Sequence, residues 1–294
     1  MLTVSNLSKT IDGQAVLRGV DFKLEQGRVV GVVGRNGAGK TTLFKTMAGI
    51  LIPDAGTVEY EGQSIHATPS KKLNIVFIPD SPEALFSYTA MESALFFSHI
   101  YPTFDKGFFS NTLHKLELPL DRKIRQFSKG MRMLFSTVLG LATKAPFVLL
   151  DEPTNGIDAI AKKQVMTLLM EAAEEGTTLV ISSHLLNELE RVADTILVMK
   201  AGGIETHDMD ETANGAVRKF QVVFRDEAPA SWLNSPSVRV LDKIGRVYTV
   251  LVDTKAPIGA LEEMGKFDPL LMEHLPMKLE DLFVWKLGGS NYVG

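Results

Sequence analysis

The sequence predicts an α/β protein with a mostly parallel sheet, an antiparallel β subdomain at the N-terminus, a helical insertion and a small α+β domain at the C-terminus. Two observations lead to this prediction. Short, nearly continuous apolar runs, typical of strands covered on both faces, alternate along the chain with segments of helical periodicity. After residue 214 the pattern changes to short strands and two brief helices. Alternating strands and helices favour a parallel sheet with helices on both faces.

The segment 1–65 contains half-buried and fully buried strands. Apolar residues alternate with polar ones in the first type, whereas residues 28–34 form a nearly continuous apolar run that leads through glycines into a helix. Pro53 stops that helix. The predicted elements are half-buried strands at 2–4 and 20–24, a buried strand at 28–34, a helix at 39–50, and two strands joined by a Glu61–Gly62 turn at 56–65.

The central part of the chain alternates between helices and buried strands. Residues 85–142 are rich in Phe, Leu and Met at helical spacings, which predicts a mostly helical insertion. The elements that follow are a buried strand at 146–151, a helix at 158–176, a strand at 177–184, a helix at 185–193, and a strand with a turn at 194–203.

The change of pattern near Gly215 predicts a domain boundary. Residues 1–214 then form the larger domain, and residues 215–294 form a small α+β accessory domain without a catalytic motif. Its predicted elements are strands at 219–224, 238–241 and 247–252 and an amphipathic final helix at 278–287.

Composition limits the class of protein. A chain of 294 residues suggests about two domains of roughly 150 residues each. The fractions of apolar residues, 45%, and charged residues, 22%, are those of an ordinary globular protein. The net charge of -4 gives no electrostatic reason to expect nucleic acid as a partner. The absence of cysteine excludes disulfides and thiolate metal sites and fits a reducing compartment.

Neither a signal peptide nor a membrane span is predicted. The N-terminus lacks a basic segment followed by an apolar one. The longest apolar stretch, residues 133–150, is interrupted by Lys144 and Pro146, which favours a core helix followed by a buried strand. We therefore expect a cytosolic location.

The segment GRNGAGKTT fits the phosphate-loop pattern G-x-x-x-x-G-K-S/T and lies between a predicted strand and a predicted helix. Glycines let backbone N–H groups surround phosphate oxygens, and the helix N-terminus adds a favourable partial charge. Lys40 would neutralise the β- and γ-phosphates, and the Thr41 hydroxyl would ligate Mg²⁺. The expected nucleotide-binding residues are Gly34, Asn36, Gly37, Ala38, Gly39, Lys40, Thr41 and Thr42.

The strand in FVLLDEP delivers two acids to the carboxyl edge of the sheet, where ligands bind in open α/β folds. Asp151 is the expected Mg²⁺ partner, and Glu152 would polarise the attacking water as the general base. Taken alone, these two residues could be solvated acids that merely end a strand. Together with the phosphate loop, they predict a nucleotide-hydrolysing site.

Four segments, GRNGAGKTT, QFSKGMRM, FVLLDEPTNGID and TTLVISSH, occur in the order and spacing of the nucleotide-binding subunits of ABC transporters, which residues 1–210 resemble. The resemblance implies an ATPase that binds ATP and Mg²⁺ between two subunits arranged head to tail. In this family a signature segment, usually Leu-Ser-Gly-Gly-Gln, begins a helix that faces the γ-phosphate held by the opposite subunit. Here Ser128 and Gly130 retain a hydroxyl and an unobstructed backbone N–H at a helix start, although an ordinary helix cap would look the same.

The resemblance also assigns roles to two residues outside these central motifs. His184 would contact the γ-phosphate and hold the water and Glu152 in line, although a lone histidine is more often structural. Asp158 would help to join the two sites across the dimer.

The chain departs from the family pattern at three places. Asp80 stands where the family usually has Gln, and its carboxylate could reach Mg²⁺ or the attacking water through a bridging water. Ile11 replaces the aromatic residue that stacks on adenine, which predicts weaker and less selective base binding. Lys129 and Met131 replace Gly and Gln of the signature.

The Ser-Lys-Gly-Met signature, the small C-terminal extension and residues 101–118 resemble bacterial ABC-2 type exporter ATPases, in particular those similar to the acetoin-utilisation subunit and to exporters of drugs or antimicrobial and amphipathic peptides. This implies a second ATPase subunit, identical or related, and a separate transmembrane permease, with this chain bound peripherally at the inner face of the cell membrane. A cytoplasmic coupling helix of the permease would dock in a groove between the Asp80 segment and the helical insertion. The candidates for lining this groove, several of which could instead be plain core residues, are Phe86, Tyr88, Phe96 and Phe97.

Two questions of function stay open in the sequence. A regulatory or sensory ATPase that acts through a membrane partner is the alternative to an exporter subunit. The C-terminal domain resembles extensions that support dimerisation or regulation, and packing alone would explain it equally well.

Overall fold

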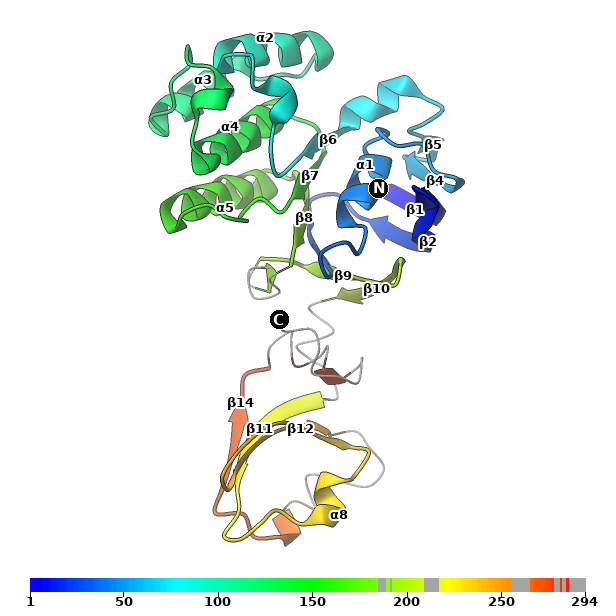
Figure 1. Cartoon of the computed structure of the whole chain (residues 1–294), viewed down its shortest axis with the longest axis vertical. Coiled ribbons are helices and arrows are strands. Elements are labelled where there is room, and N and C mark those ends of the chain that lie inside the picture. The colour runs from blue at the N-terminus through cyan, green and yellow to red at the C-terminus, as the bar shows by residue number, and fades with distance from the viewer. Residues whose placement is uncertain are drawn as a thin grey trace. The chain divides into compact units, whose positions relative to one another are not determined.

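The computed structural model describes residues 1–184, 189–190, 192–208, 217–254, 265–277, 281 and 284–285. The chain divides into two compact units, Met1–Asp208 and Met209–Gly294 (Figure 1). The boundary predicted at residues 214 and 215, and most of the predicted helices at 185–193 and 278–287, lie outside the described residues.

A six-stranded sheet forms the centre of the first unit, with the strand order β10-β9-β3-β8-β7-β6 (Figure 1). Every pairing in this sheet is parallel except that of β10 with β9. All residues of β3, β7 and β8 are buried, as expected of parallel strands that are covered on both faces. The prediction of a mostly parallel sheet is confirmed. The strands are β3 (Val29–Val33), β6 (Ile75–Ile78), β7 (Phe147–Asp151), β8 (Thr178–Ser183), β9 (Thr195–Lys200) and β10 (Gly203–Asp208).

An antiparallel sheet with the order β2-β1-β4-β5 accounts for the N-terminal β subdomain. Its strands are β1 (Leu2–Ile11), β2 (Gln14–Leu24), β4 (Ala55–Tyr60) and β5 (Gln63–Ser64). Helix α1 (Lys40–Met47) contributes Leu43, Phe44 and Met47 to a core that also contains side chains of both sheets. The phosphate loop therefore leads into a helix whose inner face is anchored between the two sheets.

The predicted helical insertion is present as α2 (Ala90–Ile100), α3 (Lys106–Lys115) and α4 (Lys129–Ala142), with short 3₁₀ segments at η2 (Glu83–Leu85) and η3 (Ile124–Gln126). A further 3₁₀ segment, η1 (Pro69–Asn74), precedes β6. The side chains of Thr89, Asp105 and Ser128 accept hydrogen bonds from backbone N–H groups and cap the three helices. Helix α5 (Ala159–Glu174) follows β7 and packs against α4.

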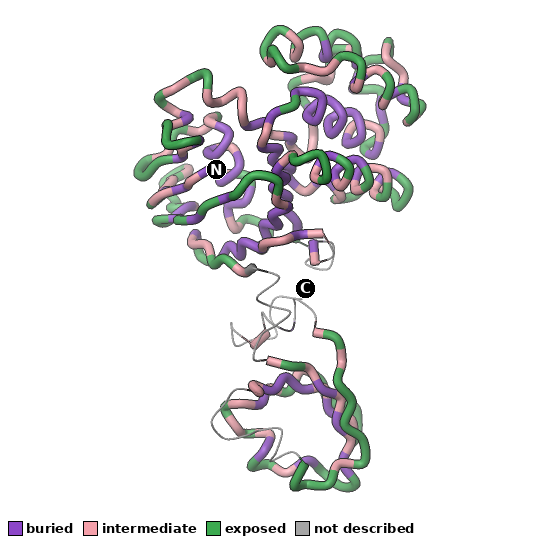
Figure 2. Tube along the Cα trace, turned by 180° about the vertical axis from the view of Figure 1, so that it is seen from behind, coloured by how far each residue is buried: buried purple, intermediate pink, exposed green. Residues whose placement is uncertain are grey.

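The second unit contains a four-stranded antiparallel sheet with the order β12-β13-β11-β14. Its described elements are β11 (Val217–Val223), α8 (Ala230–Leu233), β12 (Val238–Ile244), β13 (Val247–Asp253) and β14 (Leu271–Leu275). Phe224 contacts the rings of Trp232 and Tyr248 in its core, which Figure 2 shows as buried segments. Strand β14 was not predicted, because all but one of its residues are exposed and give no alternation of burial.

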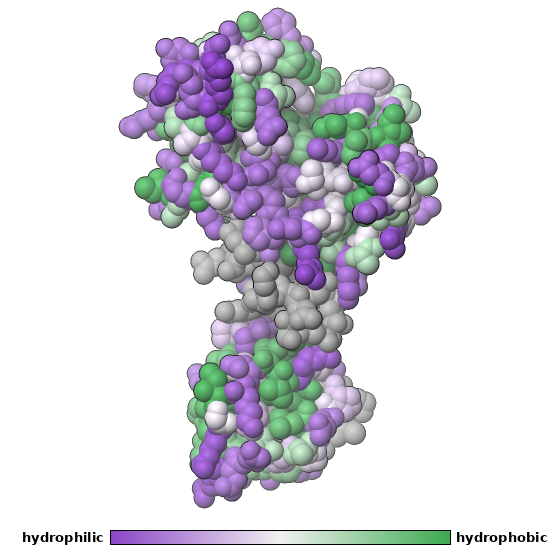
Figure 3. Space-filling view, in the orientation of Figure 1, coloured by the Kyte–Doolittle hydropathy of each residue, from purple (hydrophilic) through white to green (hydrophobic). Residues whose placement is uncertain are grey.

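Apolar side chains also reach the surface of the second unit (Figure 3). They are Val240, Ile244, Phe267, Leu270, Leu271 and Met272. Among the helices that the structure describes, none combines the length and the apolar character that a membrane span needs.

Two glycines, one in β4 and one just after it, provide a test of the packing of β4 against β1. Gly56 has a φ of 81°, and a Cβ atom there would lie 2.2 Å from the backbone oxygen of Asn6 on β1. Gly62 has a φ of 73° and no atom within 4 Å of its Cβ position. We expect Gly56→Ala to lower the free energy of unfolding of the first unit by about 3 kcal/mol, because strain and a backbone clash add. Gly62→Ala should cost about 1 kcal/mol, from strain alone. Denaturant unfolding followed by circular dichroism measures both, and equal losses would contradict the packing argument.

Candidate active site

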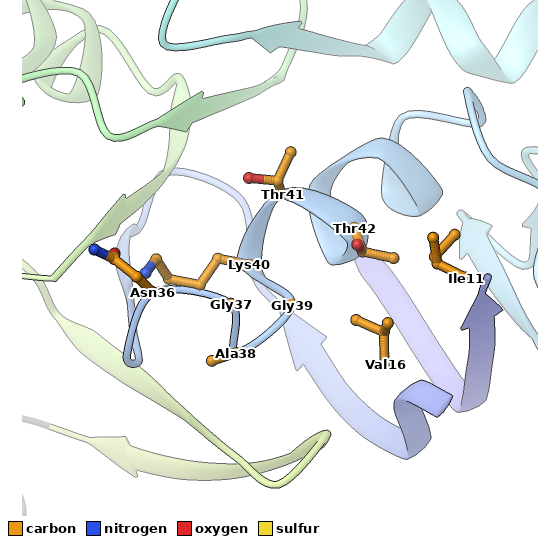
Figure 4. Close-up of a pocket in the computed structure, with 9 residues that line it drawn as sticks. All are labelled: Ile11, Val16, Asn36, Gly37, Ala38, Gly39, Lys40, Thr41 and Thr42. Carbon is orange, nitrogen blue, oxygen red and sulfur yellow. The ribbon is translucent and has the colours of Figure 1, made fainter. Parts of the chain in front are cut away.

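The phosphate loop forms the wall of a pocket at the start of α1 (Figure 4). Gly37 and Gly39 have φ values of 80° and 103°, which residues other than glycine rarely adopt. A Cβ atom on Gly39 would also lie 2.8 Å from Cγ1 of Val16. Seven of the eight residues predicted for nucleotide binding line this pocket together with Ile11 and Val16, namely Asn36, Gly37, Ala38, Gly39, Lys40, Thr41 and Thr42.

The Lys40 side chain is 7% exposed and is held by two oxygen atoms. Its Nζ donates a hydrogen bond to the backbone oxygen of Gly34 at 2.7 Å and lies 3.1 Å from Oε1 of Glu152. A buried ammonium group needs such partners, because desolvation without them would be costly. The contact with Gly34 explains why this residue belongs to the site although it does not line the pocket.

Asp151 ends β7 and is held through both of its carboxylate oxygens. Oδ2 accepts a hydrogen bond of 2.5 Å from the Thr41 hydroxyl, and Oδ1 accepts one of 2.7 Å from the Ser182 hydroxyl. The two residues predicted to hold Mg²⁺ from these motifs are thus in direct contact. Both offer the oxygen ligands that Mg²⁺ prefers, and the phosphates and water would have to supply the others. Within the described residues, no three acidic or histidine side chains form a metal site by themselves.

Glu152 lies where the phosphate loop, β7 and β8 meet. Its φ of 50° is in the left-handed region, and its backbone N–H donates to the Ser182 hydroxyl at 2.9 Å. Oε1 pairs with Lys40, and Oε2 lies 2.7 Å from Nδ1 of His184. Because a carboxylate can only accept, Nδ1 of His184 carries the proton in this hydrogen bond. The structure therefore brings Lys40, Glu152 and His184 together.

Ser128 is the N-cap of α4, and Gly130 lies in the first turn of α4 and faces α5. The exposed Ser128 side chain accepts a hydrogen bond from the backbone N–H of Met131 at 3.2 Å. Gly130 is buried, and a Cβ atom there would lie 2.9 Å from the Cβ of Ala161 on α5. Close packing of the two helices is thus a reason for glycine at this position, in addition to the unobstructed N–H group that the sequence predicts there.

Asp158 caps α5, with backbone N–H groups of Ile160 and Ala161 donating to its Oδ1 at 2.9 and 3.0 Å. The hydrogen bond from Ala161, supported by the one from Ile160, holds the pKa of Asp158 below its ordinary value. Asp158 also approaches Gly130, since a Cβ atom on Gly130 would lie 3.3 Å from Oδ2. These residues form a second group of site candidates at the facing ends of α4 and α5.

Asp80 and Lys129, two of the departures from the family pattern, form an ion pair with 3.2 Å between Oδ1 and Nζ. Both side chains are 41% exposed, and Lys129 also extends to Gly156, whose Cβ position is 3.1 Å from Nζ. This ion pair links the segment after β6 to the start of α4 and was not predicted from the sequence. The proposed contact of Asp80 with Mg²⁺ stays a prediction.

The four residues named as candidates for a docking groove differ in exposure. Tyr88 and Phe96 are exposed, at 48% and 57%. Phe86 is half-buried beneath Arg132, and Phe97 is half-buried and stacks on Tyr101. Only the first two are available as surface.

The fold and the site define a phosphate-loop ATPase, and comparisons with known proteins identify its family. The family described as ABC transporter matches residues 17–155. The ABC transporter ATP-binding protein YtrB of Bacillus subtilis is 33% identical over 293 residues, with 99% of each chain covered. The bacitracin transport ATP-binding protein BcrA of Enterococcus faecalis is 30% identical over 303 residues, which cover 99% of this chain and 97% of that protein.

A solved structure described as an ATP-binding subunit of an ABC transporter has a TM-score of 0.66 and 26% identity, and covers 73% of this chain and 92% of its own. The chain belongs to the ABC transporter ATP-binding proteins, which confirms the resemblance seen in the sequence. It is an ABC ATPase and binds ATP.

The pocket wall offers aliphatic side chains, Ile11 and Val16, where an aromatic ring would stack on a base. Ile11→Tyr should strengthen ATP binding by about 1 kcal/mol, or about fivefold, because a ring adds stacking to plain apolar contact. Isothermal titration calorimetry with ATP and GTP measures the change, and Ile11→Leu is the control that adds no ring. An unchanged or lower affinity for Ile11→Tyr would show that the base does not lie against Ile11.

Proposed function

We propose that this chain is the ATP-hydrolysing subunit of a bacterial exporter and that its working form is a dimer, of identical or related subunits, around two ATP molecules. Each ATP would lie between the phosphate loop of one subunit and Ser128 and Gly130 of the other. The contact that carries this proposal is the convergence of Lys40, Glu152 and His184 at 3.1 and 2.7 Å. Ser128 supports the proposal, because its side chain is exposed at the start of α4. The contact described for its hydroxyl is with the backbone N–H of Met131, so the surface around it is available to a phosphate of another subunit.

The contacts at the phosphate loop suggest how the residues act on ATP. Backbone N–H groups of the loop and Lys40 would bind the β- and γ-phosphates, so that Lys40 exchanges its contact with Glu152 for phosphate oxygens. Thr41 and Asp151 would hold Mg²⁺, which when bound neutralises phosphate charge. Glu152 is then free to orient the attacking water and to accept its proton on Oε1, while His184 keeps the carboxylate in place through Oε2.

A separate transmembrane permease would complete the transporter, with this chain bound at the inner face of the membrane. Five large apolar side chains on and beside α2 are exposed, namely Tyr88, Met91, Leu95, Phe96 and Ile100. Exposed apolar side chains on and beside one helix suit a docked protein helix. The name of BcrA refers to bacitracin transport, and this supports drugs or amphipathic and antimicrobial peptides as the exported class.

A regulatory ATPase that senses a ligand through its membrane partner would use the same site. The two functions differ in flux. Reconstitution of the chain with its permease in vesicles should give ATP-dependent movement of a labelled peptide antibiotic. Signalling that responds to the ligand while the vesicles show no flux would favour the sensor instead.

Glu152→Gln tests the hydrolytic centre. The substitution keeps the size of the side chain but removes the base, so ATP binding should persist while the rate of hydrolysis falls by about a thousandfold. The trapped ATP should leave a dimer that size-exclusion chromatography separates from the monomer. Ser128→Arg in the same chain should abolish that dimer, because the cap would then obstruct the partner's phosphates. An active Glu152→Gln enzyme would refute the assignment of the base.

The surface of α2 can be tested independently of catalysis. Replacing Leu95 and Phe96 together by Gln should reduce the stimulation of ATPase activity by the permease about tenfold or more, because both side chains would lose apolar contact area. Basal hydrolysis should not change. Ile52→Gln is the matched control, because Ile52 is 73% exposed and does not belong to α2. Equal effects of the two variants would contradict docking at α2.

A further inference from the structure

Ser182 is a hydroxyl residue inside a strand that is otherwise mostly apolar. It lies near the carboxyl end of β8, in register with Asp151 on β7 and with Val32 on β3. Its exposed fraction is 0%, so its hydroxyl has to find partners within the protein. Those partners are the two acidic residues of the site.

One hydroxyl group serves both acids. Ser182 Oγ donates to Oδ1 of Asp151 at 2.7 Å and accepts from the backbone N–H of Glu152 at 2.9 Å. Of the side chains that fit this volume, only a hydroxyl both donates and accepts well; a methyl group does neither, and a thiol does both weakly. The identity of the residue is therefore matched to this pair of contacts.

Each hydrogen bond determines a different part of the geometry. With Oδ1 of Asp151 held by Ser182, Oδ2 is directed to the Thr41 hydroxyl at 2.5 Å. The backbone of Glu152 has a φ of 50°, a conformation that residues other than glycine adopt only when their surroundings impose it. Two hydrogen bonds hold this backbone: the Glu152 N–H donates to Ser182, and the Glu152 carbonyl oxygen accepts from the backbone N–H of Asn155 at 3.1 Å. The turn places the carboxylate against Lys40 and His184.

We propose that Ser182 is a positioning residue of the hydrolytic centre, which sets the carboxylate of Asp151 toward the metal site and the carboxylate of Glu152 toward the attacking water. This inference rests on the proposed roles of Asp151 and Glu152. Ser182 itself does not contact the reacting atoms in this account; it acts through its two neighbours.

The matched control lies on the same strand. Thr178 is also 0% exposed, and its hydroxyl accepts a hydrogen bond of 3.0 Å from the backbone N–H of Gly27, at the end of β8 remote from the site. Ser182→Ala and Thr178→Ala each remove one buried hydroxyl from β8. Because Thr178→Ala also removes a buried methyl group, it should lower the melting temperature at least as much as Ser182→Ala does. Only Ser182→Ala should disturb the acids.

The first measurement is steady-state hydrolysis. We expect Ser182→Ala to lower kcat by about a hundredfold, the order expected for a small misplacement of reacting groups, with KM for ATP changed less than about threefold. Thr178→Ala should keep kcat within about twofold. Ser182→Thr, which retains a hydroxyl, should recover a large part of the rate. A Ser182→Ala enzyme with the kcat of the unmodified chain would overturn the proposal, as would an equal loss in Thr178→Ala.

The second measurement does not depend on turnover. Binding of Mn²⁺ together with ADP, followed by electron paramagnetic resonance, should be about tenfold weaker in Ser182→Ala and unchanged in Thr178→Ala, because Asp151 has lost its fixed orientation. Unchanged Mn²⁺ binding would argue against the positioning role. If Ser182→Ala does not fold, Ser182→Cys replaces it, and full activity with this weak donor would equally overturn the proposal.

Glu152→Gln in the same assays separates this inference from the function on which it rests. If Glu152→Gln stalls hydrolysis while Ser182→Ala is fully active, only the role of Ser182 fails. If Glu152→Gln remains active, the proposed hydrolytic centre itself fails.

Discussion

The common carboxyl edge of β3, β7 and β8 is the constraint on which the site depends. Parallel pairing places Val32 beside Ser182 and Asp151 beside Ser182 on its other side, so the three strands end together. The phosphate loop leaves from the first of these strands, the acidic pair from the second and His184 from the third. A slip of one residue in any of these pairings would turn the side chains to the opposite face of the sheet and separate the groups. The buried apolar strands therefore fix the geometry of the chemistry.

Charge balance at this edge connects binding to hydrolysis. Lys40 is almost fully buried and is neutralised by Glu152, which is itself only 15% exposed. Both carboxylate oxygens of Glu152 are engaged in this arrangement, Oε1 by Lys40 and Oε2 by His184. Phosphate oxygens offer Lys40 a stronger set of negative charges than one carboxylate does. Binding of ATP would thus free Glu152 from Lys40 and leave it available for its proposed role as the general base.

The parts of the site that follow local rules could be predicted from the sequence. A glycine-rich loop between a strand and a helix, and two acids at the end of an apolar strand, are patterns of neighbouring residues. The contacts of Ser182 depend on strand register, and the pair of Asp80 with Lys129 depends on two loops that meet only in the folded chain. Neither signal is local, although a hydroxyl at the carboxyl end of a buried strand could have suggested the first. Strand β14 was missed because its residues are largely exposed.

The position of α4 favours a site shared between two subunits. Its start is held by Gly130 against Ala161 of α5, and its end by Gly140, whose Cβ position is 2.4 Å from Cδ1 of Ile78 on β6. These contacts hold α4 closely against α5 and β6 of its own subunit. Ser128 nevertheless presents a hydroxyl and a helix N-terminus to the surface, an arrangement that favours negative charge. In the proposed dimer a neighbouring subunit would supply the phosphate that meets this charge, and association would then be a requirement of hydrolysis.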